Sequence, residues 1–225
     1  MAIGAHTGDA QLTCGKTLAR HSLLGDRITT LDVTAGERGA PAGMETDAFR
    51  LVNLKGAAEF ASMLNGQSIV LNHRDGEVPE NEDIKFELCD LIRRHKPDVV
   101  MTHWSNSMHK DHMTVHRLVN DAIFYAALPT IERELPAHYA RGPYYAENWE
   151  DSHGFVPYIY VDVTEGYNLW HEAVQKLWLT NNSPWFKYLE YYDALSRSRG
   201  ALVHRKRAEC FAVGPYDMKQ VISSF

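Results

Sequence analysis

Residues 2–24 read AIGAHTGDAQLTCGKTLARHSLL: a short apolar run, a polar turn, and a longer segment with apolar residues at helical spacing. We expect Ala2–Ala5 to form a buried strand and Asp9–Leu24 to form a helix. The polar residues between them would then follow the strand directly. A strand that leads through a short loop into a helix is the repeating unit of α/β proteins with parallel strands.

The same alternation of strand and helix continues along the chain. Further strands are predicted over Arg27–Ala35, Ser68–Leu71, Asp98–Thr102 and Tyr158–Val163. Further helices are predicted over Ala48–Leu64, Asp83–His95, Asp111–Ala127, Glu165–Leu179 and Pro184–Gly200. Right-handed crossovers between parallel strands place helices on both faces of a sheet. The sequence therefore predicts an α/β fold in which residues 1–225 form one Rossmann-like domain with a mostly parallel sheet.

One segment does not fit this alternation. Residues 128–154 are irregular and rich in aromatic residues, and they contain Pro129, Pro136, Gly142 and Pro143. A connection of this length without secondary structure is uncommon and is usually functional. We therefore interpret the segment as a lid or an interface.

Composition excludes several classes of protein. The chain has 225 residues, 44% of them hydrophobic, which suffices for a sizeable core. The net charge is −6 and the one basic cluster, His204–Arg207, is typical of a solvated turn, so we expect no nucleic-acid partner. No apolar stretch approaches the roughly 18 residues of a membrane span. The N-terminus lacks the regions of a signal peptide, and the scattered Cys14, Cys89 and Cys210 form no Cys-x-x-Cys pair, which favours the reducing cytoplasm.

Polar residues follow several predicted strands. Ligands of open parallel sheets bind beyond the carboxyl ends of the strands. The segments that follow strands here are Ala5–Asp9, Thr34–Gly39, His103 and His109–His112. We expect them to converge on one crevice.

His6, Asp9 and His112 would give this crevice two imidazoles and one carboxylate, a ligand set for Zn²⁺ or another divalent transition metal. Three protein ligands leave one position open for water, whose pKa falls to about 7 on zinc. Spacing alone leaves two alternatives open. The histidines could cap helices or lie there by chance, or the metal could bind His109, His112 and His116, which share one helical face.

At these residues the chain resembles the PIG-L/LmbE-like superfamily of zinc-dependent N-acetylglucosaminyl deacetylases, whose members open with a strand followed by Ala-His-Pro-Asp-Asp. Ala5–Asp9 is similar to that pattern, and His109–His112 is similar to the His-Pro-Asp-His of the family. The other matching segments are Thr34–Glu37, Asp75-Gly76, Pro97–Val100, Arg199-Gly200 and Ala208-Glu209. Since the matches cover nearly the whole chain, the resemblance implies a single deacetylase domain.

The resemblance also implies a role for each matching residue. The metal ligands would be His6, Asp9 and His112. His109 would act as an acid or electrostatic stabiliser of the tetrahedral intermediate, and Asp111 would orient a histidine. The substrate-binding residues would be Asp75, Glu37, Arg38 and Trp104. The Trp104 ring could stack on a sugar face, although core packing is the more common fate of such a ring.

The chain departs from the family at two places. Gly8 stands where the family has the Asp that deprotonates the attacking water. Glu37, Asp111 and His109 are candidates to replace that base because all follow strand ends of the same crevice, and Glu37 ranks lowest on geometry. Asn53–Gly56 replaces an Arg-x-x-Glu that family members often carry, which allows a different amide or acyl group.

The leading hypothesis is a zinc-dependent hydrolase that removes an acetyl or other acyl group from an N-acylated amino sugar or a related small-molecule amide. An alternative is a non-catalytic member that keeps the metal and only binds a carbohydrate-like ligand. A third hypothesis is a lyase or other hydrolase in which the substrate supplies the base. The retained His109–His112 segment favours catalysis, because a mere binder needs no acid-type histidine. The superfamily often assembles into trimers or hexamers, so the resemblance also implies a homo-oligomer.

Overall fold

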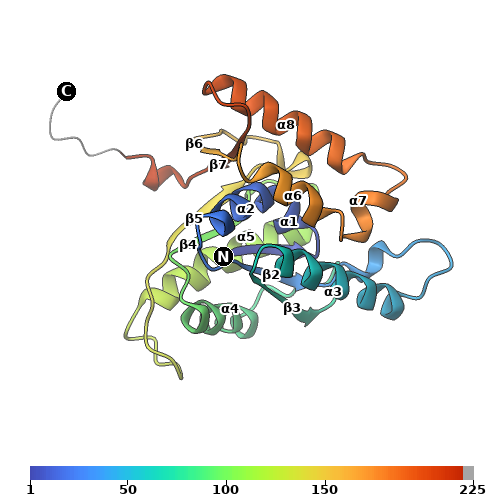
Figure 1. Cartoon of the computed structure of the whole chain (residues 1–225). Coiled ribbons are helices and arrows are strands. Elements are labelled where there is room, and N and C mark those ends of the chain that lie inside the picture. Colours follow the sequence, from blue (N-terminus) through green and yellow to red (C-terminus); the bar gives the residue numbers. More distant parts are fainter. Residues whose placement is uncertain (220–225) are drawn as a thin grey trace, which may run out of the picture.

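The computed structural model of the chain describes residues 1–219. Seven strands form one sheet in the order β3-β2-β1-β4-β5-β7-β6 (Figure 1). They are β1 (Ala2–His6), β2 (Thr29–Thr34), β3 (Gln67–His73), β4 (Val99–His103), β5 (Arg141–Ala146), β6 (Ile159–Asp162) and β7 (Ala208–Ala212). β1 to β5 run parallel, whereas β7 is antiparallel to β5 and to β6. The predicted mostly parallel α/β fold is confirmed.

Helices cover both faces of this sheet (Figure 1). They are α1 (Asp9–Thr13), α2 (Gly15–Leu23), α3 (Thr46–Met63), α4 (Glu82–His95), α5 (Lys110–Ala127), α6 (Tyr167–Val174), α7 (Trp178–Asn182) and α8 (Tyr188–Leu202). One hydrophobic core is filled from α4 and α5, and the other from α1, α2, α3, α6 and α8. Ala2 and Ile3, neighbours in β1, belong to opposite cores, as the alternation of side chains along a strand requires.

The helix predicted over Asp9–Leu24 is divided at Cys14 into α1 and α2. Gly15 begins α2 against the indole ring of Trp170, and a Cβ atom at position 15 would lie 2.5 Å from that ring. The close approach of α6 therefore requires glycine at this position. The helix predicted over Glu165–Leu179 is also divided, because α6 ends at Val174 and α7 is a separate turn of helix.

Two strands, β5 and β7, are absent from the sequence-based prediction. β5 lies inside residues 128–154, so the interpretation of that whole segment as a lid or interface is wrong for residues 141–146. Gly142 and Pro143 hide the strand, since both residue types are depleted in strand interiors. β7 has only five residues, all buried, and follows the exposed turn at 204–206, so no alternation of polar and apolar residues marks it.

Glu209 ties β7 to the N-terminal part of the chain. Its Oε1 atom lies 3.1 Å from Lys16 Nζ, and its Oε2 atom accepts the backbone N–H of Thr17 at 2.8 Å. Lys16 and Glu209 are both buried, and the Lys16 ammonium also lies 4.0 Å from the centroid of the Trp170 ring. The antiparallel part of the sheet is thereby anchored to α2.

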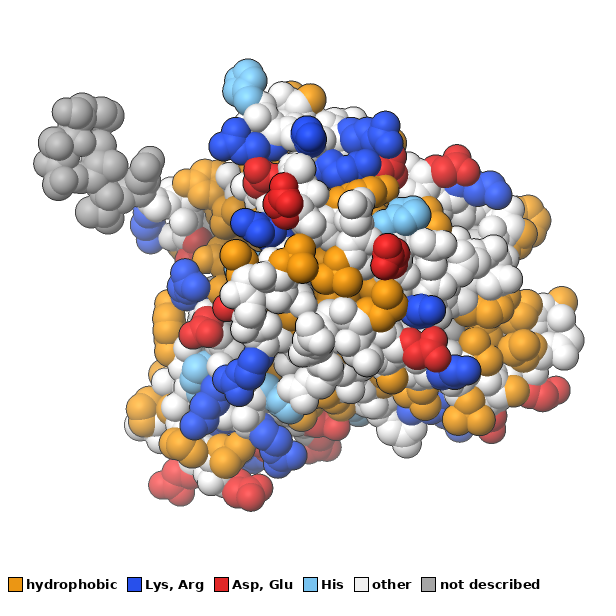
Figure 2. Space-filling model, in the orientation of Figure 1, with side chains coloured by type: hydrophobic (Ala, Val, Ile, Leu, Met, Phe, Trp, Pro, Cys, Tyr) orange, Lys and Arg blue, Asp and Glu red, His pale blue; other side chains and the backbone are white. Residues whose placement is uncertain are grey.

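Apolar side chains are exposed near the start of α3. Figure 2 shows hydrophobic side chains gathered at this end of the molecule, where Met44, Leu51 and Val52 are exposed. Exposed apolar patches often mark protein contacts, and the homo-oligomer remains a prediction. Among residues 1–219, no helix combines the length and the apolar character that crossing a membrane requires.

Arg93, in the last turn of α4, is a buried charge that holds two other segments in place. Its side chain is 1% exposed. The guanidinium donates hydrogen bonds to the carbonyl oxygens of Tyr125, Ala126, Leu128, Ile131 and Leu135. The first two belong to the last turn of α5, where helix carbonyls lack partners within the helix. Arg93 therefore closes the end of α5 and fixes the chain that follows it.

We expect Arg93→Met to lower the free energy of unfolding by about 3–5 kcal/mol, because it leaves several buried carbonyl groups without a donor. Arg93→Lys keeps the charge but loses the planar fork of donors, so its stability should lie between those of the wild type and Arg93→Met. Urea unfolding followed by circular dichroism measures the change. An unchanged midpoint for Arg93→Met would show that water or another donor replaces the guanidinium.

Candidate metal centre and active site

The carboxyl ends of the central strands bring the predicted ligands together. His6 ends β1 and His103 ends β4, while Asp9 begins α1 and His112 lies in the first turn of α5. Parallel strands end at the same edge of the sheet, so residues about a hundred positions apart in sequence meet there. All three predicted metal ligands belong to this group.

One oxygen atom of Asp9 lies at the centre of the cluster. Asp9 Oδ2 accepts the backbone N–H of His6 at 2.8 Å and lies 3.2 Å from His6 Nδ1. It is also 3.3 Å from His112 Nε2 and 3.3 Å from His103 Nε2. A single carboxylate therefore faces three imidazole rings.

The outer nitrogen of each predicted imidazole ligand faces another carboxylate. His6 Nε2 lies 3.2 Å from Asp75 Oδ1 and 3.3 Å from Asp111 Oδ2. His112 Nδ1 lies 3.1 Å from Asp151 Oδ1. Carboxylates at the outer nitrogen fix the ring orientation and direct the lone pair of the inner nitrogen toward an ion. Asp111 thus lies where its implied role of orienting a histidine requires it.

Two of the three distances between the predicted ligand atoms match those around a small divalent cation. Tetrahedral coordination at roughly 2.0–2.1 Å places neighbouring ligand atoms about 3.3 Å apart, close to the distances from Asp9 Oδ2 to His6 and His112. The Nε2 atom of His103 accepts the backbone N–H of Ala5 at 2.9 Å, so its lone pair is already engaged. His6 and His112 therefore remain as imidazole candidates beside Asp9.

Among the described residues, the predicted combination of His6, Asp9 and His112 is not one of the sets of three whose ligand atoms all lie close together. Four sets of three side chains have ligand atoms within 4.8 Å of one another. They are His6 with His109 and His112, Asp9 with His103 and His112, His6 with Asp75 and Asp111, and His112 with Glu150 and Asp151. His116, the third member of the rival helical-face cluster, belongs to none of them, and its Nδ1 atom lies 2.9 Å from the carbonyl oxygen of His103.

The electrostatics of the cluster favour positive charge at its centre. Burial alone would lower the pKa of His6, but the carboxylates of Asp9, Asp111 and Asp75 outweigh it and raise that pKa well above the ordinary value. Burial also opposes the charge of His112, yet Asp9 and Asp151 raise the pKa of this imidazole to about 10. When the histidines are neutral, the buried carboxylates leave the cluster with a net negative charge. A divalent cation at the centre would balance that charge.

His109 lies over the two predicted imidazole ligands. Its ring centroid is 4.5 Å from that of His6 and 5.0 Å from that of His112. It is the N-cap of α5, and its Nδ1 atom accepts the backbone N–H of Asp111 at 3.2 Å. A neutral ring that accepts at Nδ1 carries its proton at Nε2. Burial and the neighbouring His6 and His112 lower the pKa of His109, so the ring remains a neutral donor.

Gly8 has a backbone conformation that residues other than glycine rarely adopt. Its φ angle is +117°, and a Cβ atom there would lie 2.5 Å from Leu179 Cδ2 of α7. A cavity of about 50 Å³ adjoins it and is also lined by Asp9 and Glu150. This volume is enough for one or two water molecules. Burial raises the pKa of the Glu150 carboxyl group, which lies 3.6 Å from His112 Nδ1.

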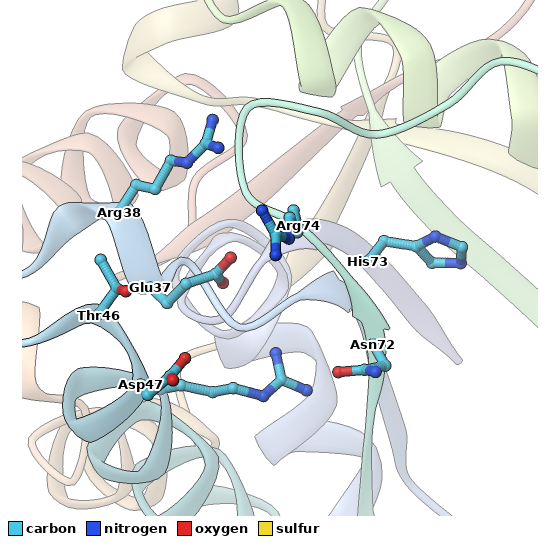
Figure 3. Close-up of a pocket in the computed structure, with 8 residues that line it drawn as sticks. Glu37, Arg38, Thr46, Asp47, Asn72, His73 and Arg74 are labelled. Atoms are coloured by element: carbon cyan, nitrogen blue, oxygen red, sulfur yellow. The ribbon is translucent and has the colours of Figure 1, made fainter.

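The predicted substrate-binding residues separate into two groups. Glu37 and Arg38 line a larger pocket beside Asp75 (Figure 3), and Glu37 Oε1 accepts the backbone N–H of Asp75 at 2.9 Å. Trp104 is packed edge-on against Tyr145 and Phe155, and its indole N–H donates to the carbonyl oxygen of His153. Its ring is thus engaged with protein groups.

Glu150 and Asp151 are the site residues that sequence reasoning missed. They lie in a short 3₁₀ turn, Trp149–Asp151, that follows β5. Because the sequence pattern does not predict β5, it gives no reason to treat the acidic pair after it as strand-end residues. The signal present in the sequence is two adjacent acids within an aromatic-rich segment.

We expect His112→Ala to lose the bound metal, because it removes one of three ligands. His116→Ala, one turn further along α5, is the matched control and should retain it. Metal content per chain, measured by mass spectrometry on the purified proteins, checks both. Loss of metal from His116→Ala would place the ion on the rival helical-face cluster, and full retention by His112→Ala would contradict both assignments.

The fold recurs in known proteins. The chain is 26% identical to the conserved protein TT1542 from Thermus thermophilus, with 100% of this chain and 97% of that chain covered and a TM-score of 0.83. It has the fold of GalB, the 4-carboxy-2-hydroxymuconate hydratase of Pseudomonas putida (19% identity, coverage 100% and 98%, TM-score 0.87). It also has the fold of the N,N'-diacetylchitobiose deacetylase of Pyrococcus horikoshii (20% identity, coverage 96% and 85%, TM-score 0.81).

The sequence itself carries the family assignment. The model of the GlcNAc-PI de-N-acetylase family, PIG-L, matches residues 1–123, more than half of the 225 residues. The matched part contains β1 to β4 and the three predicted metal ligands His6, Asp9 and His112. The chain belongs to the GlcNAc-PI de-N-acetylase (PIG-L) family.

Proposed function

We propose that the chain is a zinc-dependent hydrolase that removes an acetyl or other acyl group from an N-acylated amino sugar or a related small-molecule amide. The observation that carries this proposal is the Asp9 carboxylate held between His6 and His112, with the His109 ring above them. Membership of a de-N-acetylase family and a fold shared with a named deacetylase support the same reaction class.

His6, Asp9 and His112 would hold the ion, with Zn²⁺ favoured by a ligand set of two imidazoles and one carboxylate. The ion supplies a Lewis acid that polarises the amide carbonyl and makes water easier to deprotonate. Asp111 and Asp151 orient the two imidazoles through their outer nitrogens. These contacts keep the ring planes fixed before substrate arrives.

His109 would stabilise the carbonyl oxygen as it gains negative charge. Its Nδ1 atom is occupied by the N–H of Asp111, so Nε2–H is the donor that remains. A fixed donor aimed at a developing oxyanion is worth more than one that must reorient during the reaction. The N-cap position of His109 supplies that fixation.

Glu150 would take the role of the general base. Glu37 has one oxygen bonded to the backbone N–H of Asp75, and Asp111 has one bonded to the backbone N–H of Gly76. Asp111 also lies at the outer nitrogen of His6, and Glu150 lies 3.6 Å from the outer nitrogen of His112. Glu150, by contrast, lines the small cavity beside Gly8 and Asp9. It places a carboxylate near the position where the family pattern has one.

The reaction would proceed in two steps. A water molecule gives one proton to the Glu150 carboxylate while its oxygen bonds to the carbonyl carbon of the amide, and His109 Nε2–H donates to the carbonyl oxygen. Glu150 then returns the proton to the amide nitrogen as the C–N bond breaks. The products are a carboxylic acid and a free amine.

Glu150→Gln should lower kcat by about 10²–10⁴-fold while leaving the metal content unchanged, because it removes a proton acceptor and keeps the shape of the side chain. Acetate release from a panel of N-acetyl sugars measures the rate. Glu37→Gln is the comparison, since its amide oxygen can still accept the N–H of Asp75. A large loss of kcat in Glu37→Gln with none in Glu150→Gln would identify Glu37, and not Glu150, as the general base.

Gly8→Asp alone should not increase the rate of acetate release above that of the wild type, even though it restores the residue of the family pattern. The substituted residue would need a φ angle near +117°, which costs about 1–3 kcal/mol, and Leu179 would have to move. Gly8→Asp combined with Leu179→Ala removes the steric conflict but not the backbone strain. Thermal unfolding and acetate release on both variants test this, and a faster Gly8→Asp single variant would contradict it.

A second candidate is the addition of water to an unsaturated acid or its elimination from a hydroxy acid. Gly8 favours it, because such a reaction does not need the aspartate of the deacetylase pattern, and a named hydratase shares the fold. The product separates the two candidates, since nuclear magnetic resonance distinguishes released acetate from a hydroxy acid. If the protein binds metal but turns over neither class of substrate, the remaining hypothesis is a non-catalytic protein that only binds a carbohydrate-like ligand.

A further inference from the structure

We infer that His103 is a positioning residue that fixes the ring of the predicted metal ligand His112 through the carboxylate of Asp151. The inference rests on the proposed function, because it concerns how the same metal centre is held. His103 ends β4 and is 4% exposed. The proposed reaction assigns it no role, yet its ring contacts both β1 and α5, the elements at which the predicted ligands lie.

The backbone of β1 determines which nitrogen of His103 carries the proton. The backbone N–H of Ala5 can only donate, and it lies 2.9 Å from His103 Nε2. That nitrogen must therefore accept, so the ring carries its proton at Nδ1. His103 Nδ1 lies 3.3 Å from Asp151 Oδ2. His103 is thus a fixed donor to Asp151.

Asp151 in turn determines which nitrogen of His112 carries the proton. The second oxygen of Asp151, Oδ1, lies 3.1 Å from His112 Nδ1. An ionised carboxylate can only accept, so His112 is protonated at Nδ1 and keeps the lone pair of Nε2 for a metal. The Ser107 hydroxyl oxygen also lies 3.2 Å from His112 Nδ1, but Ser107 is only half-buried, whereas Asp151 is 0% exposed. Asp151 is therefore the partner that is shielded from water.

The two imidazole rings also support each other by packing. The centroids of His103 and His112 lie 4.0 Å apart, and their planes are inclined by 17°. The carboxylate of Asp151 joins the Nδ1 atoms of both rings, and all three side chains are buried. A partner at the outer nitrogen of a metal-bound histidine contributes about 10–100-fold to metal affinity. Losing the contact from His103 to Asp151 should therefore be measurable as weaker metal binding.

Side chains of β4 hold the end of β1 next to the site. The backbone register between the two strands is set at Ala2. Further along, Thr102 Oγ1 donates to the carbonyl oxygen of Ile3 at 2.9 Å, and His103 accepts the N–H of Ala5. His103 therefore makes two separable contacts, one that holds β1 and one that orients Asp151.

A rival role for His103 is direct metal ligation. His103 Nε2 lies 3.3 Å from Asp9 Oδ2, and Asp9, His103 and His112 form one of the sets of three whose ligand atoms lie close together. A ligand needs the lone pair of Nε2, whereas a positioning residue needs the N–H at Nδ1. Two substitutions separate these needs. The amide nitrogen of asparagine lies near the position of Nδ1 and donates, and the amide oxygen of glutamine lies near the position of Nε2 and accepts.

Zinc affinity is measured on the wild type, His103→Asn and His103→Gln by competition with a coloured chelator, and the visible absorption of the Co²⁺-loaded proteins reports the coordination geometry. We expect His103→Gln to weaken Zn²⁺ binding about 10–100-fold and to change the cobalt bands, because it loses the donor to Asp151. His103→Asn should bind Zn²⁺ as the wild type does and keep the bands.

Urea unfolding of the metal-free proteins separates this effect from a general loss of stability. His103→Asn leaves the buried N–H of Ala5 without an acceptor, so it should unfold at a lower urea concentration than His103→Gln. The order of the two variants in stability is then the reverse of their order in metal affinity. A merely structural role would give the same order in both measurements.

The matched control is the same pair of substitutions at His138. Its Nε2 atom lies 2.8 Å from the carbonyl oxygen of Pro97, at the amino end of β4 and so opposite the site. His138→Asn and His138→Gln should both bind Zn²⁺ as the wild type does. Weaker binding by either would show that loss of a histidine contact anywhere in the fold disturbs the metal, which would overturn the inference.

Three other results would also overturn the inference. Loss of Zn²⁺ from His103→Asn with retention by His103→Gln would make His103 a ligand, and equal affinities of the two variants would remove its link to Asp151. A wild type that binds no Zn²⁺ would refute the metal centre as well. Acetate release is measured separately. If no N-acetyl sugar is hydrolysed but only His103→Gln binds Zn²⁺ weakly, the hydrolase proposal fails and the inference stands; if such sugars are hydrolysed and the two variants bind Zn²⁺ equally, the reverse holds.

Discussion

The carboxylate oxygen of Asp9 that faces three imidazole rings is the constraint around which the site is organised. It fixes the turn between β1 and α1 through the backbone N–H of His6, and it fixes the distance between that turn and α5 through His112. The side chain of Gln11 holds this turn in place, because it accepts the N–H of Gly8 and donates to Asp32. The ligands of this network come from a strand end or from the first turn of a helix, so the sheet topology and the site geometry determine each other.

The same arrangement explains how positive and negative charge share a small volume. The acids around His6 and His112 are buried, and each orients an imidazole or accepts a backbone N–H. The arginines lie further out, around an open pocket that water can enter. A cation at the inner position would be favoured by this layout, and Asp75 contacts both regions.

The N-terminal half of the fold could be predicted from sequence because hydrophobic periodicity marks it clearly. β1 to β4 and their helices follow the simple pattern of buried strand and amphipathic helix, and His6, Asp9 and His112 follow from it as residues after strand ends. The later part could not be predicted in the same way. Pro143 lies inside β5, and the five buried residues of β7 show no alternation, so neither strand is recognisable from its pattern. Asp151 and Glu150 are missed with β5, since their importance depends on where that strand ends.

Gly8 and Leu179 together have a consequence for how this protein could change over evolutionary time. The backbone at position 8 and the leucine of a helix far along the chain occupy the space that an aspartate side chain would need. An aspartate at position 8 would therefore carry a cost in strain unless the backbone and Leu179 moved together. Glu150 lines the same cavity without such a cost, so position 8 and position 150 differ in how easily each can present a carboxylate there.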